Sequence, residues 1–348
     1  MHNKPICIQF KNDNTSGEEM LQVAGIHVVM GVLGYAQSKL YWQQDTQVPV
    51  IAKCMTRDRF YELRNYMHFV DNTSEHNEKL WKVKPFLDCV QKKCLTLPRS
   101  HHLSVDEQMV PFSGKCGFVT YVPSKPNPLG LKCFILAAPD GLVLDFMFYN
   151  GSGTVSAEDI KEYGLGAAVV KMMTESVPRD NQHCVYTDRF FTNVKSVDML
   201  LGRKIYQTVK DNKSVVILSS WVGSSPPTTY KRRSREHKKK IDVPQPVEMK
   251  LYNENMGGVD LCDRFLSYYR CYIRTSKWPV RMFNHFIDLV IVNSCRSDLV
   301  SEKTGGANGV GMIGTSAPVS TRKTSHDEMS VMYKRPFGQM DEWTECNV

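Results

Sequence analysis

The first hundred residues carry apolar side chains at helical spacing, which predicts a small helical part. Ser16 lies three residues before Glu19, a capping-box pattern, and an apolar segment follows to about Tyr35. Thr56 can cap a second helix, and Pro85 suits the first turn of a third. No chemical motif occurs in this part.

From Leu103 onward, apolar and polar residues alternate with a period of two, which is typical of strands. The turn residues Pro139, Asp140 and Gly141 join two of these segments in a hairpin. Two helical segments, 157–173 and 192–201, interrupt the series. This order predicts a mixed α/β layer sheet with flanking helices. The predicted strands are 103–109, 118–122, 131–138, 142–149, 183–187, 204–209 and 214–219.

The stretch 221–248 is rich in Pro and basic residues and is interpreted as a linker without packed elements. A helical region, in two helices, is predicted from Asn255 to about Ser297, and the Gly- and Ser-rich remainder is expected to be loosely ordered. The resulting division is 1–100, 101–220, 221–250, 251–300 and 301–348.

The charge of the chain is concentrated in one run. Lys and Arg number 44 against 36 Asp and Glu, for a net charge of +8, and KRRSREHKKK at 231–240 holds +6 of it. Such a run is typical of a nuclear-import signal or a phosphate-contacting patch, and it also fits a solvated loop. Each phosphate contact would steepen the slope of log DNA affinity against log salt concentration by about 0.9. The basic residues are Lys231, Arg232, Arg233, Arg235, Lys238, Lys239 and Lys240.

Cysteine and histidine spacing gives no metal or disulfide motif. The eleven cysteines include no CxxC pair, which favours reduced thiols in a cytosolic or nuclear protein. The pair His101-His102 has no second partner at metal-binding spacing, so a surface turn is the simpler interpretation.

Two other classes of protein, membrane-associated and nucleotide-binding, are not supported by the sequence. The apolar stretch 23–36 is too short to cross a bilayer, and Glu18 and Glu19 before it are unlike a signal peptide, so no membrane association is predicted. The segment 309–314 fits GxGxxG but lacks the strand and helix of a dinucleotide site, so no nucleotide cofactor is predicted.

Four acids stand out by position. Asp106 lies within the first predicted strand, Asp188 at the end of a buried strand, and Asp260 and Asp263 share one face at a helix start. Carboxylates so placed can hold two Mg²⁺ ions for phosphodiester cleavage and strand transfer. Strand-end and helix-cap acids are the ordinary interpretation of the same residues. Nearby Lys125, Lys132 and Arg189 could contact backbone phosphates or be surface cations.

Three long segments resemble the piggyBac-type transposase family. They are 103–146, beginning LSVDEQM; 185–206, VYTDRFFTNVKSVDMLLGRKIY; and 252–294, beginning YNENMGGVD. The helical front is also similar, and the match is collinear over about residues 20–300.

The resemblance implies an RNase H-like core with flanking helices that bind DNA and dimerise the protein. It implies cutting and rejoining of double-stranded DNA at TTAA targets, in the nucleus, with Mg²⁺. The metal ligands would be Asp106 in SVDEQ, Asp188 in YTDRFF and Asp260 in GGVD, with Asp263 as a supporting acid.

The sequence also departs from the family pattern. The resemblance begins inside the family's helical region, the stretch after Thr208 is shorter, and the cysteine-rich zinc domain has no counterpart around Cys346. Two further hypotheses therefore stay open. One is a catalytically inactive DNA- or protein-binding module, and the other is a truncated product that folds poorly and has no role.

Overall fold

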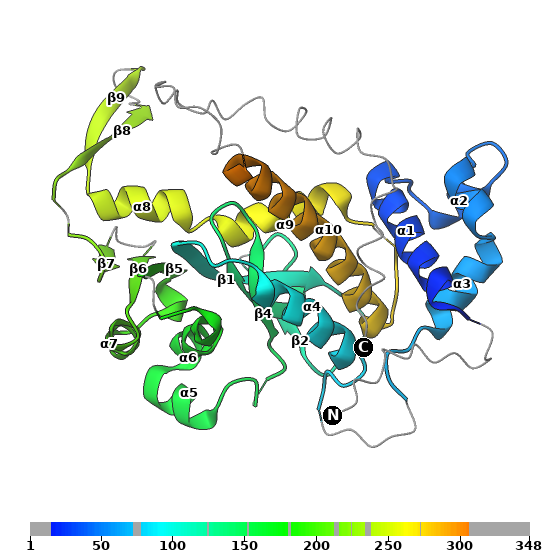
Figure 1. The fold of residues 1–348 in the computed structure, drawn as a ribbon, viewed down its shortest axis with the longest axis horizontal. Coiled ribbons are helices and arrows are strands. Elements are labelled where there is room, and N and C mark those ends of the chain that lie inside the picture. Colours follow the sequence, from blue (N-terminus) through cyan, green and yellow to red (C-terminus); the bar gives the residue numbers. More distant parts are fainter. Residues whose placement is uncertain are drawn as a thin grey trace.

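The fold is seen in a computed structural model that describes most of the chain (Figure 1). A seven-stranded mixed sheet lies at its centre, with helices on both faces. The described residues are 15–71, 78–123, 125–151, 153–179, 182–211, 216–223, 225–233, 238–271 and 273–305.

The sheet has the order β2-β3-β1-β5-β6-β7, and β4 also pairs with β3. β1 runs antiparallel to β3 and parallel to β5, which is itself parallel to β6. The prediction of a mixed α/β sheet is therefore confirmed. The strands are β1 (His102–Pro111), β2 (Val119–Tyr121), β3 (Leu129–Ala137), β4 (Val143–Phe148), β5 (His183–Asp188), β6 (Ile205–Asp211) and β7 (Val216–Ser219).

Alternation along β1 divides the core between the two faces of the sheet. Leu103 and Val105 pack with one cluster, which includes α5 (Ala157–Tyr163), α6 (Leu165–Met173) and α7 (Val194–Gly202). Val110 belongs to the other cluster, with α4 (Lys84–Thr96), α9 (Gly258–Tyr269) and α10 (Trp278–Gly305). The even-numbered residues of β1, Asp106 among them, share the face of Val110.

Helices from early and late parts of the chain pack together beside the sheet (Figure 1). α1 (Gly17–Leu33) begins with the predicted Ser16–Glu19 capping box and contacts α9 and α10. His27 of α1 lies 3.1 Å from Asp288 of α10, both buried. α3 (Arg57–Tyr66) begins after Thr56 as predicted, whereas the 3₁₀ turn Ser38–Trp42 and the short α2 (Pro49–Cys54) were not predicted.

The segment 157–173 is two helices where the sequence pattern predicts one. Gly164 lies between α5 and α6 with φ +77°, a conformation that ends a helix and that glycine adopts without strain. The break lets α6 bury Ala168 and Val169 against the sheet while α5 has no buried residue.

The interpretation of 221–248 as a linker is wrong. β8 (Thr228–Arg233) and β9 (Lys240–Gln245) pair antiparallel in a two-stranded sheet, and α8 (Val247–Asn255) follows directly. Figure 1 shows this hairpin projecting from the end of α8 that faces away from α9. Neither strand holds a fully buried residue, which explains why apolar patterning gave no signal.

No helix in the described ranges is long and apolar enough to cross a membrane. The GxGxxG segment and most of the tail expected to be loosely ordered, from residue 306 on, lie outside the described residues. α10 itself continues to Gly305, past the expected end at Ser297.

Candidate functional site

The parallel pairing of β1 and β5 brings two of the four acids together. His102 lies opposite Cys184 and Ser104 opposite Tyr186. The ladder ends at this second pair, and two residues further along each strand Asp106 and Asp188 lie within electrostatic range of each other. Both acids therefore leave the same face of the sheet, at the point where β5 ends.

The start of α9 lies against this face of β1. Gly258 contacts Ser104 so closely that an added Cβ would lie 2.7 Å from the Ser104 hydroxyl oxygen and would overlap the Ala138 carbonyl. Further along, the Gln108 amide Nε2 donates to Asp263 Oδ1 over 2.7 Å. Asp260 lies between these two contacts on the helix, as Asp106 does on the strand. The helix thus brings its acids to the acids of the sheet.

A single lysine is paired with the strand acids. Lys125 Nζ lies 3.9 Å from Asp106 Oδ1 and 3.3 Å from Glu107 Oε1, and it donates to the Glu107 carbonyl over 3.0 Å. Lys125 also interacts electrostatically with Asp260. The acid cluster is therefore partly neutralised by one cation from the segment that follows β2.

Burial and mutual repulsion perturb the acids. Burial raises the pKa of Asp106 to about 7, opposed by Lys125 and increased by Glu107 and Asp188. Burial likewise raises the pKa of Asp188, with repulsion from Glu107. Burial raises the pKa of Asp263 to about 6, although the hydrogen bond from Gln108 acts in the opposite direction. Crowded carboxylates of this kind occur at functional sites.

Two site residues escaped the sequence analysis. Lys210 of β6 is the register partner of Asp188, so it leaves the same face beside that acid. Tyr252 of α8 lies within electrostatic range of Asp106, Asp188 and Asp260, and burial raises its pKa. Lys210 lies outside the three family-like segments, and Tyr252 opens the third of them without a role having been assigned to it; the strand register and the position of α8 bring them here.

The donor set fits a hard divalent cation. Carboxylate oxygens are the protein ligands that Mg²⁺ prefers, usually one or two for each ion, with water and substrate oxygens completing the shell. Glu107 and Asp188 add to the effect of burial in raising the pKa of Asp106, and Lys125 opposes them. Within the described ranges, no three of the acids bring their carboxylate oxygens within 4.8 Å of one another.

The predicted basic residues are not gathered in one place. Lys125 is at the acids, whereas Lys132, the register partner of Met109, leaves the opposite face and lies 4.9 Å from the Phe190 ring. Arg189 is exposed directly after Asp188. The described cations of the basic run lie in β8, just before β9 and at its start, and all are exposed. These are Lys231, Arg232, Arg233, Lys238, Lys239 and Lys240, and Arg235 lies outside the described residues.

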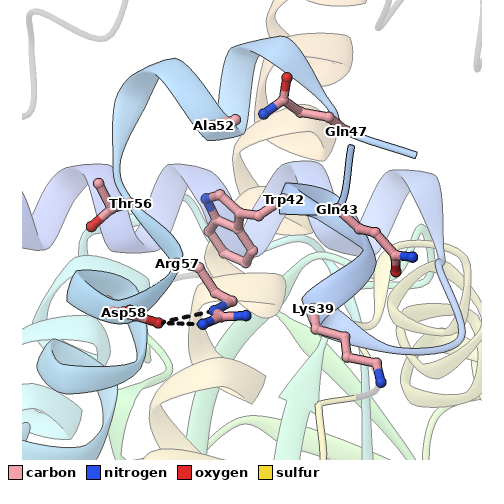
Figure 2. Close-up of a pocket in the computed structure, with 8 residues that line it drawn as sticks. All are labelled: Lys39, Trp42, Gln43, Gln47, Ala52, Thr56, Arg57 and Asp58. Carbon is pink, nitrogen blue, oxygen red and sulfur yellow. Dashed lines mark hydrogen bonds and ion pairs between the residues drawn. The ribbon is translucent and has the colours of Figure 1, made fainter. Parts of the chain in front are cut away.

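A separate hollow of about 450 Å³ lies in the helical part (Figure 2). Its acid, Asp58, is paired with Arg57 at 2.9 Å, so it offers no cluster of ligands for a cation. The indole of Trp42 forms one wall, and its Nε1 donates to the Met55 carbonyl. The lining residues are Lys39, Trp42, Gln43, Gln47, Ala52, Thr56, Arg57 and Asp58.

Comparison with known proteins gives consistent results. The family model described as Transposase IS4 matches residues 2–214 and 205–295. The human PiggyBac transposable element-derived protein 3 is 28% identical over 78% of this chain and 53% of its own length. The human PiggyBac transposable element-derived protein 2 is 25% identical over 82% and 56%. The chain thus spans about half the length of these curated relatives.

The fold has a solved counterpart. A structure titled as a piggyBac transposase synaptic complex with hairpin DNA has a TM-score of 0.67 and 21% identity, over 95% of this chain and 76% of that one. The central sheet with its flanking helices is accordingly an RNase H-like core. The extent of the family match, together with these relatives, establishes that the chain belongs to the piggyBac-type transposase family.

Proposed function

We propose that this chain is a transposase-derived, DNA-binding protein of the nucleus that retains a site for Mg²⁺-dependent DNA strand cleavage and transfer at TTAA-type targets. The observation that carries the proposal is that the parallel pairing of β1 and β5 brings Asp106 and Asp188 within electrostatic range of each other, with the start of α9 packed against β1. Family membership supplies the DNA substrate and the reaction class.

Asp106, Asp188 and Asp260 would hold the metal, with Asp263 supporting them through Gln108. Mg²⁺ in such a site supplies charge neutralisation at the phosphate and activation of the attacking oxygen. Lys125 and Lys210 flank the acids, and their ammonium groups suit the phosphates on either side of the reacting bond. The exposed cations of the hairpin suit a more distant stretch of duplex, and they are also the candidate nuclear-import signal.

Cleavage of a labelled TTAA-flanked duplex in Mg²⁺ tests this function. We expect nicking by the parent protein and its loss in Asp188→Asn, which keeps the shape of the side chain. Asp198→Asn, an exposed acid on α7, is the matched control and should retain activity. Absence of nicking by the parent would refute the enzymatic proposal, and nicking that survives Asp188→Asn would assign it to another site or a contaminant.

The competing function is a DNA-binding module without catalysis. Lys125 favours it, because this cation already neutralises part of the acid cluster, and the acid oxygens are not drawn together as metal ligands. Three results together would favour this module over the enzyme: the protein does not nick DNA, it binds DNA without Mg²⁺, and Asp188→Asn leaves that binding unchanged.

Homodimerisation, which the family resemblance implies, is part of the proposal. Light scattering coupled to size exclusion measures it directly. A mass of one chain across the concentration range, with and without DNA, would contradict it.

A further inference from the structure

Three metal-binding side chains meet at the start of β1, away from the acids. His101, His102 and Cys184 each offer a ligand atom, and these atoms all lie within 4.8 Å of one another. Among the residues that the structure describes, they are the one group of three or more such side chains with this spacing. The sequence offered only the histidine pair, and the interpretation of that pair as a plain surface turn omitted the third donor.

The strand register explains why the three groups converge. Cys184 of β5 is the direct partner of His102, so their side chains lie side by side on one face of the sheet. The chain bends at His101, just before β1, and the His101 carbonyl accepts a hydrogen bond from the Cys184 amide over 2.8 Å. The two imidazole rings consequently lie 4.6 Å apart although neighbours within a regular strand would point to opposite faces.

The surroundings already orient one ligand. His102 Nδ1 is hydrogen-bonded to the Tyr186 hydroxyl at 3.0 Å, the kind of outer contact that fixes the ring of a metal-binding histidine. Trp221 packs edge-to-face with His101 and covers one side. Glu254 of α8 lies within electrostatic range of His102 and is a candidate for a fourth position.

We propose that His101, His102 and Cys184 bind a zinc ion, with water or Glu254 as the fourth ligand. Imidazole nitrogen and thiolate sulfur are the donors that zinc prefers, and tetrahedral zinc sets its ligand atoms about 3.5 Å apart. Small rotations of exposed His101 close the remaining distance. Cys184 loses its proton to solvent as the Zn–S bond forms, and no oxidant or reductant takes part.

The site joins β1 to β5 four residues before Asp106 and Asp188 on the same two strands, at a separation of about 13 Å. A zinc ion there holds the register that sets these acids side by side. The acid site takes oxygen ligands only, so the two sites differ in the metal that they select.

Cobalt titration of the full chain, in excess Mg²⁺ to occupy the acid site, tests the proposal. A thiolate ligand produces a sulfur-to-cobalt charge-transfer band in the near ultraviolet, and zinc should displace the cobalt one for one. We expect Cys184→Ser to abolish this band and His101→Ala to weaken zinc binding more than about 10-fold. His101 is exposed, so its variant tests the site without disturbing the core.

The controls separate this site from others in the chain. Cys89→Ser, at an exposed cysteine on α4, and Asp188→Asn at the acids should leave the band and the zinc affinity unchanged. Glu254→Gln distinguishes the two candidates for the fourth ligand. Weaker zinc binding by this variant identifies the Glu254 carboxylate, and unchanged binding identifies water. No charge-transfer band in the parent, a band that persists in Cys184→Ser, or parental zinc affinity in His101→Ala would each overturn the proposal.

Discussion

Gln108 of β1 donates its amide to Asp263 of α9 over 2.7 Å and accepts a hydrogen bond from His285 of α10 at 2.9 Å. This buried amide therefore joins the central strand to α9, which carries Asp260, and to α10. An amide can satisfy a carboxylate and a neutral imidazole at once, which is why a glutamine suits this position. Burial lowers the pKa of His285 well below its ordinary value, so the ring stays neutral.

Replacing Gln108 by Leu should destabilise the protein by about 1–3 kcal/mol, because Asp263 and His285 would be buried without this partner. The free energy of unfolding in urea measures the effect. Gln37→Ala, at an exposed glutamine, should change it by less than about 0.5 kcal/mol. Equal stability of Gln108→Leu and the parent would show that the amide does not connect these elements.

Asp106→Asn should stabilise the metal-free protein at pH 8. Burial raises the pKa of Asp106 to about 7 from 3.8, so the folded state binds a proton more tightly than the unfolded chain does. Stability is therefore lost as the pH rises from about 4 to 7, and the neutral amide avoids that loss, which is up to about 4 kcal/mol at pH 8. Thermal unfolding at pH 4 and pH 8 tests this, with the difference expected only at pH 8.

With Mg²⁺ present, the parent should become more stable than Asp106→Asn. Mg²⁺ bound by the carboxylates of the folded parent stabilises the parent. It has less effect on Asp106→Asn, because that variant lacks one of the carboxylates. Melting temperatures with and without Mg²⁺ measure this, and Asp198→Asn should respond as the parent does. An identical Mg²⁺ response in parent and Asp106→Asn would argue against a metal at Asp106.

Gly258→Ala should destabilise the protein by about 1–3 kcal/mol and displace the start of α9. The new methyl group would overlap the Ala138 carbonyl and lie 2.7 Å from the Ser104 hydroxyl oxygen. Gly257→Ala is the matched control, because nothing lies within 4 Å of its added carbon. If both variants unfold at the same denaturant concentration, the close approach of α9 to β1 is not a constraint.

The buried pair His27–Asp288 should make stability fall at alkaline pH. Burial by itself lowers the pKa of His27, but the hydrogen bonds of Asp288 and Cys271 outweigh it and raise the pKa to about 9 from 6.5. The stabilisation is fully present below pH 6.5 and is lost as the pH rises through 9, by up to about 3 kcal/mol. Cooperative unfolding measured from pH 6 to pH 9.5 tests this, and His27→Gln should flatten the profile.

Neutralising the hairpin should reduce the salt dependence of DNA binding. Lys231→Gln, Arg232→Gln and Arg233→Gln together remove three exposed charges from β8. Each lost phosphate contact lowers the slope of log affinity against log salt by about 0.9. Lys92→Gln and Lys93→Gln together remove two exposed charges from α4 and serve as the control. An unchanged slope in the triple variant would remove the hairpin from the interface.

The local patterns were sufficient for most elements and for the mixed α/β class, whereas the order of strands in the sheet came from the structure. The Ser16–Glu19 capping box, the Pro139–Gly141 turn and the alternation around Asp106 each depend on neighbours in sequence, and the structure has a helix, a hairpin and a strand there. The β8–β9 ribbon was missed because its strands have no buried face to produce alternation. The break at Gly164 was missed because the residues on both sides of it follow a helical pattern, which predicted one continuous helix.

The sequence by itself determined the identities of the acids, the family to which the motifs belong and the mixed α/β architecture. Only the tertiary structure decided which side chains meet. The parallel register sets Cys184 opposite His102 and brings Asp106 near Asp188, and the packing of α8 and β6 adds Tyr252 and Lys210. Strand register is set by contacts between residues far apart in the chain, so no local spacing reveals it.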